Sequence, residues 1–273
     1  MKSHKITGGG GVNLHVLETG KADGKAILFV HGISQCSLIW NRQMNSDLAD
    51  SFRLIAMDIR GHGLSDKPTN AYGDSKLWAE DIHAVIQGLE LDKPIVACWS
   101  YGGAIITDYI ARYGEDQISG TNWVDAVCRL GEPLVEPGFV SDDFVAAIPG
   151  FFSDNVNESV AALQRLISLC IPKGLTPEER YFLLGFNMVV PPIVREGLLS
   201  RNLDNDTVLK NMRKPILLSW GENDGVVPPS MRDHIFELAG HARLSSYPGV
   251  GHTPFWEAPE RFNWELREFR EAI

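Results

Sequence analysis

Short apolar runs separated by turn residues recur along the chain and predict buried strands. They cover residues 26–30, 54–57, 94–98, 122–124, 216–220 and 244–247. Helical patterns lie between them, and the clearest places Trp78, Ile82, Val85, Ile86 and Leu89 on one stripe. Strands that alternate with helices predict a mostly parallel sheet with helices on both faces.

Two stretches depart from this alternation. Residues 5–11 and 14–18 are separated by a polar break and predict an antiparallel hairpin at the edge of the sheet. Between residues 131 and 205 no strand-like run stands out, and the amphipathic segments 139–148, 160–171 and 181–190 indicate a helical insertion. Because the core pattern resumes at Lys214, we predict one discontinuous core, residues 1–130 and 206–273, that carries residues 131–205 as a helical cap.

Composition excludes several classes of function. With 273 residues, 44% of them hydrophobic, the chain is long and apolar enough for a well-buried interior. Its 25 basic and 35 acidic side chains give a net charge of -10, which disfavours nucleic acids and anionic membranes as partners. No window has the apolar length of a signal peptide or a membrane span, so we expect a cytoplasmic protein with no membrane partner.

The four cysteines predict no cofactor. Cys36, Cys98, Cys128 and Cys170 are scattered along the chain without the spacing of a metal site or a disulfide framework. We expect buried free thiols and neither a metal nor another cofactor.

Ser100 stands where a β-branched, apolar run meets a pair of glycines, in Val-Ala-Cys-Trp-Ser-Tyr-Gly-Gly over residues 96–103. This is the pattern of a nucleophile elbow, a sharp strand-to-helix turn that needs small residues two positions before and two after the serine. The common form is G-x-S-x-G, and here Cys98 replaces the first glycine while Gly102 keeps the second. An ordinary turn fits the pentapeptide alone equally well, so the rest of the site must decide.

A serine nucleophile needs a base, and histidine is the expected one. In folds with this elbow the partners follow in the order serine, acid, histidine, which leaves His234, His241 and His252. His234 lies in a predicted helix over 230–238, and His241 lies at the start of the last strand. We choose His252 because it lies in a glycine- and proline-rich loop after that strand, where active sites of parallel sheets gather.

The acid that orients the histidine is expected in the turn that follows the strand 216–220. This turn offers Glu222 and Asp224. We choose Asp224 because an apolar pair and a proline follow its neighbouring glycine and place it deeper in the loop. Asp125, at the end of the strand before the insertion, is the reserve candidate.

Two backbone N–H groups are expected to form an oxyanion hole. One is that of Tyr101, directly after the nucleophile. The other comes from the loop after the strand 26–30, His-Gly-Ile-Ser over residues 31–34, in which Ile33 is the expected donor with Ser34 beside it.

Taken in order, these residues resemble the α/β-hydrolase superfamily. The likeness rests on the His31-Gly32 loop, the segment 58–66, the Ser100 elbow, the turn 221–228 and Gly251-His252. It implies a mostly parallel eight-stranded sheet flanked by helices, with a helical cap inserted after the sixth strand. It also implies that the segment 58–66 is a structural loop, so that Asp58, Arg60 and His62 serve the scaffold.

Within the superfamily the residues favour a serine hydrolase. Haloalkane dehalogenases and epoxide hydrolases would carry aspartate at position 100, and the carbon-carbon hydrolases would carry glycine and proline after His31-Gly32. The esterase, lactonase and cofactor-free perhydrolase group remains, and its shared step is acylation of the serine. The run 252–259 and Trp99 resemble acyl-homoserine lactonases, which keeps a lactonase open. A receptor that keeps the triad but has little turnover also stays open.

The cap supplies the expectation about the substrate. It is rich in aromatic side chains, some of which we expect to line a pocket. Ten acidic and five basic side chains in residues 131–205 disfavour an anionic substrate. We therefore expect a small, neutral, largely hydrophobic ester or lactone, contacted by Ser34, Trp99, Phe144 and Phe186.

Overall fold

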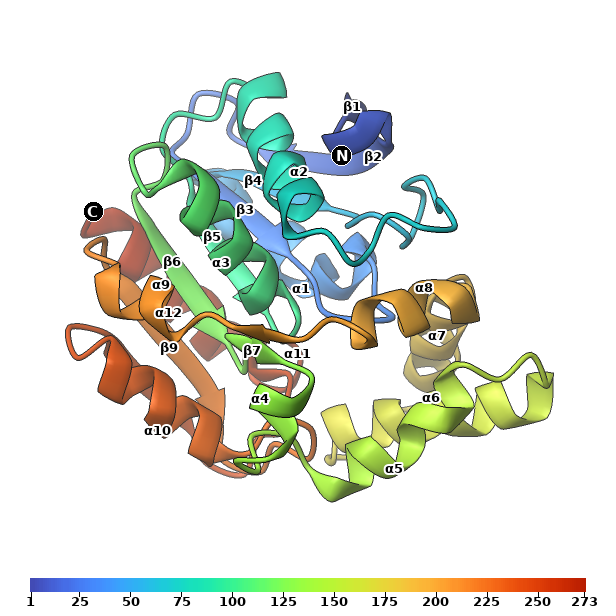
Figure 1. Ribbon diagram of the computed structural model, residues 1–273. Coiled ribbons are helices and arrows are strands. Elements are labelled where there is room, and N and C mark those ends of the chain that lie inside the picture. Colours follow the sequence, from blue (N-terminus) through green and yellow to red (C-terminus); the bar gives the residue numbers. More distant parts are fainter.

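An eight-stranded sheet runs through the centre of the computed structural model, which describes residues 1–273 (Figure 1). Across the sheet the strands are β1 (Lys2–Thr7), β2 (Asn13–Gly20), β4 (Arg53–Met57), β3 (Ala26–Val30), β5 (Ile95–Trp99), β6 (Gly120–Val124), β9 (Ile216–Gly221) and β10 (Arg243–Tyr247). Strand β2 is antiparallel to β1 and β4, and all other neighbours are parallel. The predicted sheet and its edge hairpin are confirmed, with the 3-10 turn η1 (Gly9–Gly11) between the hairpin strands.

Strands β3, β5, β6 and β9 are buried along their whole length, which explains the continuous apolar runs of β3 and β5. The polar side chains inside β6 and β9 are paired, since Asn122 donates to the Ser219 hydroxyl at 2.9 Å. Their register brings the carboxyl ends to one level: Val124 lies opposite both Trp99 and Ser219. The loops after these strands therefore emerge along one edge of the sheet, which we call the carboxyl edge. Ligand sites of open α/β sheets lie outside this edge.

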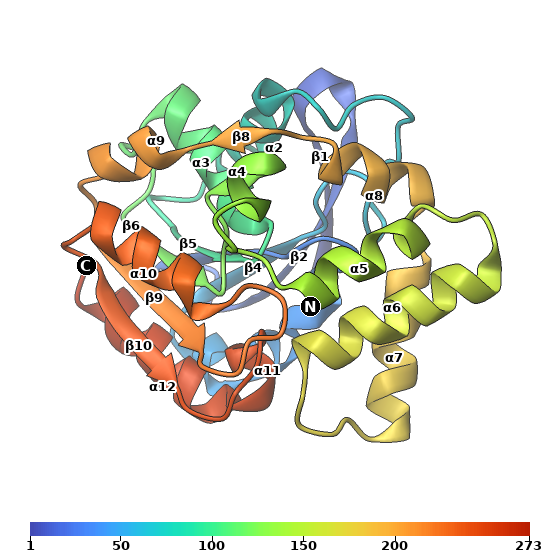
Figure 2. The ribbon, with the colours of Figure 1, turned by 60° about the horizontal axis from the view of Figure 1, so that its bottom comes forward.

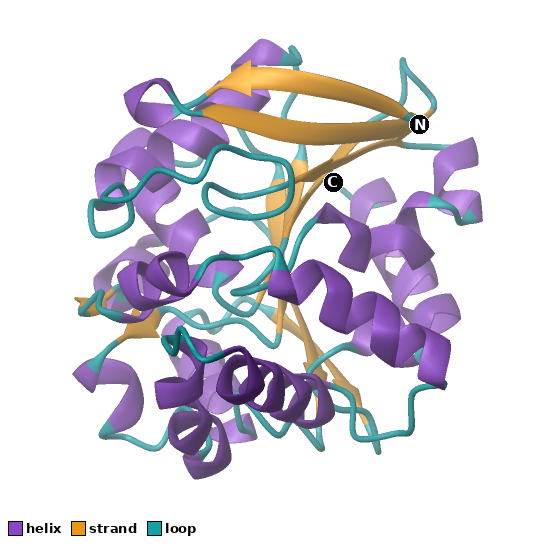
Figure 3. Ribbon diagram, turned by 90° about the vertical axis from the view of Figure 1, so that its right-hand side faces the viewer, coloured by secondary structure: helices purple, strands orange, loops and turns teal.

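Helices cover both faces of the sheet (Figures 1 and 3). One layer contains α2 (Ser75–Gly88), α3 (Gly102–Tyr113), α9 (Asp206–Asn211) and α10 (Pro229–Leu238); the other contains α1 (Asn41–Met44), α11 (Pro254–Glu257) and α12 (Pro259–Glu271), with the 3-10 turns η2 (Ser37–Trp40) and η3 (Asp47–Asp50). Helix α2 begins where the Asp74 side chain accepts a hydrogen bond from the Lys76 N–H at 2.9 Å. Its predicted stripe, including Trp78 and Ile82, is buried.

Five further helices follow β6, and the last four of them lie together to one side of the sheet (Figure 2). They are α4 (Glu132–Val135), α5 (Asp142–Phe151), α6 (Val156–Cys170), α7 (Pro177–Met188) and α8 (Pro192–Leu199). The three expected amphipathic segments correspond to α5, α6 and α7, whereas α4 and α8 were not expected. Strands β7 (Arg129–Leu130) and β8 (Leu203–Asp204) pair antiparallel and join the two ends of the insertion. The expectation of an insertion without strands is therefore wrong at β8, because a two-residue pairing leaves no periodic pattern in the sequence.

Capping residues and prolines determine where the helices of the insertion begin. Thr176 and Glu179 form a capping box at the start of α7, where Pro177 takes the first helical position. Helix α8 begins at Pro192, directly after Pro191 at its N-cap, because proline fits the first turn of a helix but not its interior. No single helix is both long and apolar enough to cross a bilayer, and α7 and α8 reach that length and composition only together, with a bend of 79° between them.

His31, directly after β3, makes folding stability depend on pH. Its ring is fully buried: Nε2 accepts a hydrogen bond from the Ile59 N–H at 3.1 Å, and Nδ1 lies 2.7 Å from the Gly32 carbonyl oxygen. Burial lowers the pKa of His31 to about 4, although the nearby Asp58 charge opposes this shift. Since the ordinary value is 6.5, the unfolded chain binds more protons below that pH. The stability contributed by neutral His31 is therefore complete above pH 6.5 and is lost as the pH falls toward 4.

We expect His31→Gln to reduce the loss of unfolding free energy between pH 7 and pH 5 by about 2 kcal/mol. Urea unfolding at both pH values measures this difference. His62, whose pKa burial also lowers, should retain part of the dependence. The exposed His241→Gln controls for the substitution itself. Equal pH dependence in wild type and His31→Gln would contradict a buried neutral His31.

Candidate active site

Ser100 occupies a sharp turn between β5 and α3. Its φ of 54° lies in the left-handed region, which is uncommon for a residue with a side chain. Gly102 allows the close approach of the next helix, since a Cβ there would lie 2.9 Å from the Val30 carbonyl oxygen. Cys98, at the position of the missing first glycine, is buried with its Sγ 3.6 Å from the Asn122 carbonyl oxygen on β6. The turn thus has the geometry of a nucleophile elbow and accommodates the thiol.

The loop after β3 lies directly against Ser100. A Cβ at Gly32 would be 2.9 Å from the Ser100 Cβ, so only glycine fits there without displacement. The Ile33 and Tyr101 N–H groups donate to no acceptor within the protein. Both are therefore free to donate to a bound group, and their role as an oxyanion hole stays a prediction. The Ser100 hydroxyl also has no hydrogen-bond partner within the protein, and the residue is 8% exposed.

The segment 58–66 fixes the loop that contains Ile33. Asp58 accepts hydrogen bonds from the Ser37 N–H at 2.6 Å and the Leu64 N–H at 2.9 Å, and it pairs with His15 at 2.8 Å. Burial opposes its ionisation, but these hydrogen bonds lower the pKa of Asp58 to about 2. His62 Nε2 accepts the Ser34 N–H at 3.1 Å. The scaffold role expected for this segment is confirmed.

Arg60 has a scaffold role as well. It forms two hydrogen bonds of 2.7 Å with Asp81 on α2 and donates to the Gly9 and Leu77 carbonyl oxygens at 3.0 Å. This buried pair ties the segment 58–66 to α2 and to the edge hairpin.

Asp224 and His252 form a buried pair at the carboxyl edge. His252 Nδ1 lies 2.7 Å from Asp224 Oδ2, and the two side chains are 1% and 0% exposed. Asp224 Oδ1 accepts the Val226 and Val227 N–H groups at 2.7 and 2.9 Å. These hydrogen bonds hold the carboxylate in the orientation that meets the imidazole. Glu222 is exposed and does not bond to His252.

The backbone holds His252 beside the elbow. Its N–H donates to the Cys170 carbonyl oxygen at 2.9 Å, and its own carbonyl oxygen accepts the Trp99 indole N–H at 2.8 Å. The Trp99 and His252 rings are 5.3 Å apart. The two histidines set aside from sequence have other partners: His234 pairs with Asp206 at 3.0 Å, and His241 Nε2 lies 3.1 Å from the Lys214 carbonyl oxygen.

Asp125, the reserve acid, lies behind the Asp224–His252 pair. It is fully buried, and its Oδ1 accepts the Gly221 N–H at 2.9 Å. Burial, and then the negative charge of Asp224, raises the pKa of Asp125 well above its ordinary value. Asp125 is therefore a second carboxyl at the site but not the hydrogen-bond partner of the imidazole.

Two clusters bring potential metal ligands together. Asp125, Asp224 and His252 place one ligand atom each within 4.8 Å of one another, as do Cys128, Asp206 and His234. In the second cluster Asp206 already pairs with Arg129 at 2.5 Å, and in the first the imidazole already bonds to Asp224. Neither donor set is free to accept a cation without breaking an existing bond.

The four residues expected to contact substrate do not share one cavity. Trp99 is 2% exposed and packs on Phe255 as a support for His252. Phe144 lines a hollow of about 280 Å³ between α4, α5 and α8, whereas Phe186 lines an apolar groove of about 770 Å³ with Leu38 and α7. Substrate contact by these side chains stays a prediction.

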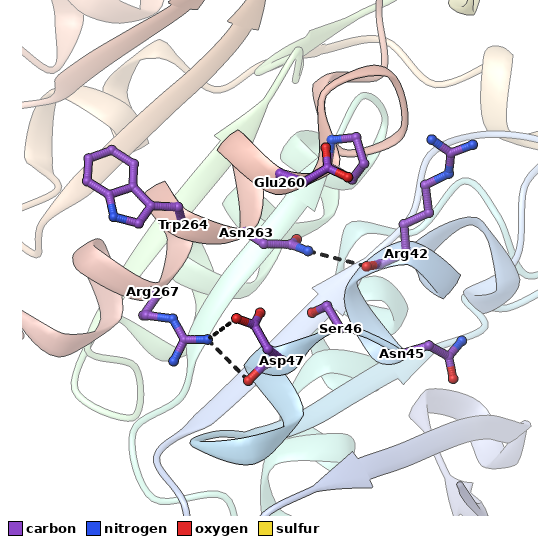
Figure 4. A pocket seen from close by; sticks show the side chains of 9 residues that line it. Arg42, Asn45, Ser46, Asp47, Glu260, Asn263, Trp264 and Arg267 are labelled. Atoms are coloured by element: carbon purple, nitrogen blue, oxygen red, sulfur yellow. Dashed lines mark hydrogen bonds and ion pairs between the residues drawn. The ribbon is translucent and has the colours of Figure 1, made fainter.

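A polar hollow of about 540 Å³ lies elsewhere, between α12 and the segment 42–47 (Figure 4). Inside it Arg267 pairs with Asp47 at 3.3 Å, and Asn263 donates to the Arg42 carbonyl oxygen at 3.3 Å. It includes none of the residues around Ser100.

Arg195 on α8 is a residue that the sequence analysis missed. It is 1% exposed and has no carboxylate partner. Its Nε donates to Ser34 Oγ at 2.9 Å, and its terminal nitrogens donate to the Phe151 and Asn187 carbonyl oxygens at 2.9 and 3.1 Å. Burial lowers its pKa to about 10, so it stays charged at neutral pH. One feature of the sequence could have identified Arg195. It lies three residues before Leu198, and this spacing places both side chains on the apolar face of an amphipathic helix.

The chain belongs to the α/β-hydrolase fold family, because the model of the family described as "alpha/beta hydrolase fold" matches residues 25–259. The resemblance inferred from the motifs is thereby confirmed.

Individual proteins extend this comparison. The crystal structure of the esterase RhEst1 from a Rhodococcus species is 33% identical, with a TM-score of 0.93 and 100% of both chains covered. Epoxide hydrolase 1 of Caenorhabditis elegans is 38% identical over 284 residues, covering 94% of this chain and 68% of that protein. The bifunctional esterase/perhydrolase DCH of Acinetobacter calcoaceticus is 28% identical over 286 residues, covering 97% of this chain and 98% of that protein.

We expect Arg195→Met to lower the free energy of unfolding by about 2 kcal/mol or more, because three buried acceptors lose their donor. Urea unfolding measures this loss, and limited proteolysis should cleave residues 131–205 faster. Arg165→Met, a substitution of an exposed arginine on α6, is the matched control. Unchanged stability and proteolysis would contradict a role for Arg195 in joining the cap helices to the loop at Ser34.

Proposed function

We propose that the protein is a serine hydrolase that cleaves a carboxylic ester through an acyl-enzyme on Ser100. The observation that carries the proposal is the buried 2.7 Å hydrogen bond between Asp224 and His252, at the same edge of the sheet as the strained turn at Ser100. The family and the esterases among its relatives support this proposal.

Acylation begins when Ser100 Oγ attacks the ester carbonyl carbon and His252 Nε2 takes its proton. The carbonyl oxygen becomes an oxyanion, which the Ile33 and Tyr101 N–H groups stabilise. The tetrahedral intermediate collapses, the bond to the alcohol oxygen breaks, and His252 returns the proton to the leaving alcohol. The acyl group is then bonded to Ser100.

Deacylation repeats these steps with water. His252 takes a proton from a water molecule as its oxygen attacks the acyl carbon, and the proton then passes to Ser100 as the carboxylic acid leaves. Asp224 holds Nδ1–H of the imidazole in both halves, so that Nε2 faces the serine and the imidazolium is stabilised. No cofactor takes part in this scheme.

Epoxide hydrolysis is the activity named for the relative from C. elegans. The resemblance to epoxide hydrolases implies an aspartate nucleophile, whose carboxylate forms an ester that water can hydrolyse. Position 100 is serine in this chain, which would form a stable ether with an opened epoxide. We therefore favour an acyl substrate.

Lactone hydrolysis and perhydrolysis share the acylation step with ester hydrolysis. A lactone, including an acyl-homoserine lactone, acylates the same serine, and hydrogen peroxide in place of water would give a peracid. The esterase/perhydrolase of A. calcoaceticus supports the second possibility. A receptor with an intact triad remains the candidate from another class of function.

The proposed substrate is small, neutral and largely hydrophobic. The groove at α7 is lined by apolar side chains that include Tyr181, Phe182 and Phe186. The excess of acidic over basic side chains in residues 131–205 disfavours an anionic acyl or alcohol group.

We expect steady hydrolysis of a short-chain p-nitrophenyl ester by the purified protein and a loss of about a thousandfold or more in kcat for Ser100→Ala. Ser3→Ala, at an exposed serine of the edge hairpin, should match wild type. Parallel assays with lactones test for a different acyl donor, and assays with peroxide plus acetate test whether peroxide replaces water as the acyl acceptor. Undiminished activity in Ser100→Ala would overturn the nucleophile assignment, and a ligand-induced thermal shift without turnover would favour the receptor.

We expect Asp224→Asn to lower kcat by about a hundredfold or more, because the amide offers the imidazole the wrong hydrogen-bonding group. Glu222→Gln removes the neighbouring exposed carboxylate and should leave kcat nearly unchanged. Circular dichroism checks that both variants are folded. The opposite ranking would show that the acid is misassigned.

A further inference from the structure

Asp125 has a buried carboxyl group in which one oxygen has no hydrogen-bond partner. It follows β6 with a φ of 43°, in the left-handed region, and it is 0% exposed. Its Oδ1 accepts the Gly221 N–H at 2.9 Å, whereas its Oδ2 has no N–H or O–H donor. Buried polar atoms are nearly always hydrogen-bonded, so this oxygen requires an explanation.

The surroundings of Asp125 are acidic. Asp224 and His252 place ligand atoms within 4.8 Å of it, and Glu257 and Cys170 are the other titratable groups at this site. No lysine or arginine bonds to Asp125. Glu257 accepts the Gly251 N–H at 2.8 Å and therefore has a partner of its own.

Two carboxylates cannot both stay ionised so close together without a cation. Asp224 is the charged member, since it accepts two backbone N–H groups and the imidazole N–H. Asp125 has the weaker set of donors, and burial together with the Asp224 charge raises its pKa. As a carboxylic acid, Asp125 would carry its proton on the oxygen that has no donor.

We propose that Asp125 is a positioning residue that stays protonated and donates a hydrogen bond from Oδ2 to the Asp224 carboxylate. The Gly221 N–H holds Oδ1, and this leaves Oδ2 free for the proposed hydrogen bond. Asp224 is then held from both sides, by the Val226 and Val227 N–H groups and by Asp125, in the orientation that accepts from His252. The kinetic part of this inference rests on the proposed ester hydrolysis, whereas its structural part does not.

Asparagine is an isostere of protonated aspartate, so Asp125→Asn and Asp125→Ala test the inference. In the first variant the amide oxygen accepts from Gly221 and the amide nitrogen donates to Asp224. We expect kcat within about threefold of wild type for Asp125→Asn, and a fall of about tenfold or more with little change in KM for Asp125→Ala. The pH dependence of kcat/KM should be the same in Asp125→Asn and wild type between pH 6 and 8.

Infrared difference spectroscopy supplies a readout independent of turnover. At pH 7 the wild type should show the carbonyl stretch of a protonated carboxyl group that Asp125→Asn lacks. Asp81→Asn is the matched control at a buried acid that pairs with Arg60; it should lower the thermal midpoint, whereas Asp125→Asn should not.

Three results would overturn the inference. The wild type and Asp125→Asn could have the same carboxyl band, which would mean that Asp125 is ionised. Asp125→Asn could lose as much activity as Asp224→Asn, which would make Asp125 the orienting acid. Stabilisation of wild type by added zinc, reversed by a chelator and absent in Asp125→Asn, would instead identify a metal site. If Ser100→Ala keeps full activity, the proposed function fails while the infrared test of Asp125 still stands.

Discussion

The backbone hydrogen bonds of Ser100 are the constraint on which the candidate site depends. Its N–H donates to the Val124 carbonyl oxygen at 3.0 Å, and its own carbonyl oxygen accepts the Gly103 and Val127 N–H groups at 3.0 and 3.1 Å. These bonds hold the residue in a left-handed conformation that a serine seldom adopts. Because two of the three partners belong to β6 and the segment after it, the parallel pairing of β5 with β6 is what places the hydroxyl at the carboxyl edge.

The loop that bears the Ile33 N–H is held from two directions. The segment 58–66 binds it from the core through His62 and Asp58, and Arg195 binds the Ser34 hydroxyl from the cap. Arg195 at the same time bonds to the ends of α5 and α7. Cap packing and the position of the Ile33 N–H are therefore coupled through one guanidinium.

The sequence allowed most of the core to be predicted because strands such as β3 and β5 are continuous apolar runs and each site residue lies in a loop or turn after a strand. Ser100, Asp224 and His252 could be ordered from chain position alone. The choice between Asp125 and Asp224 was harder, because both follow strands that end at the same edge. Their roles differ through contacts made over long sequence distances: Asp125 meets Gly221, and Asp224 meets His252. The cap was predicted less well, since α8 is short and follows two prolines, and packing rather than periodicity fixes its place.

Two buried groups of opposite charge lie at different parts of the candidate site. Asp224 bonds to His252, and the cation of Arg195, which has no carboxylate partner, bonds to Ser34 beside Ile33. Under the proposed mechanism the transition state carries a positive imidazolium next to Asp224 and a negative oxygen next to the loop that contains Ile33 and Ser34. Charges fixed in a dry interior act through a low effective dielectric, and they need no reorganisation when the reaction occurs. The free-energy cost of burying the Arg195 charge is thus offset during folding, before any substrate binds. The acyl carbonyl would then enter an electric field that already favours the negative charge that its oxygen develops.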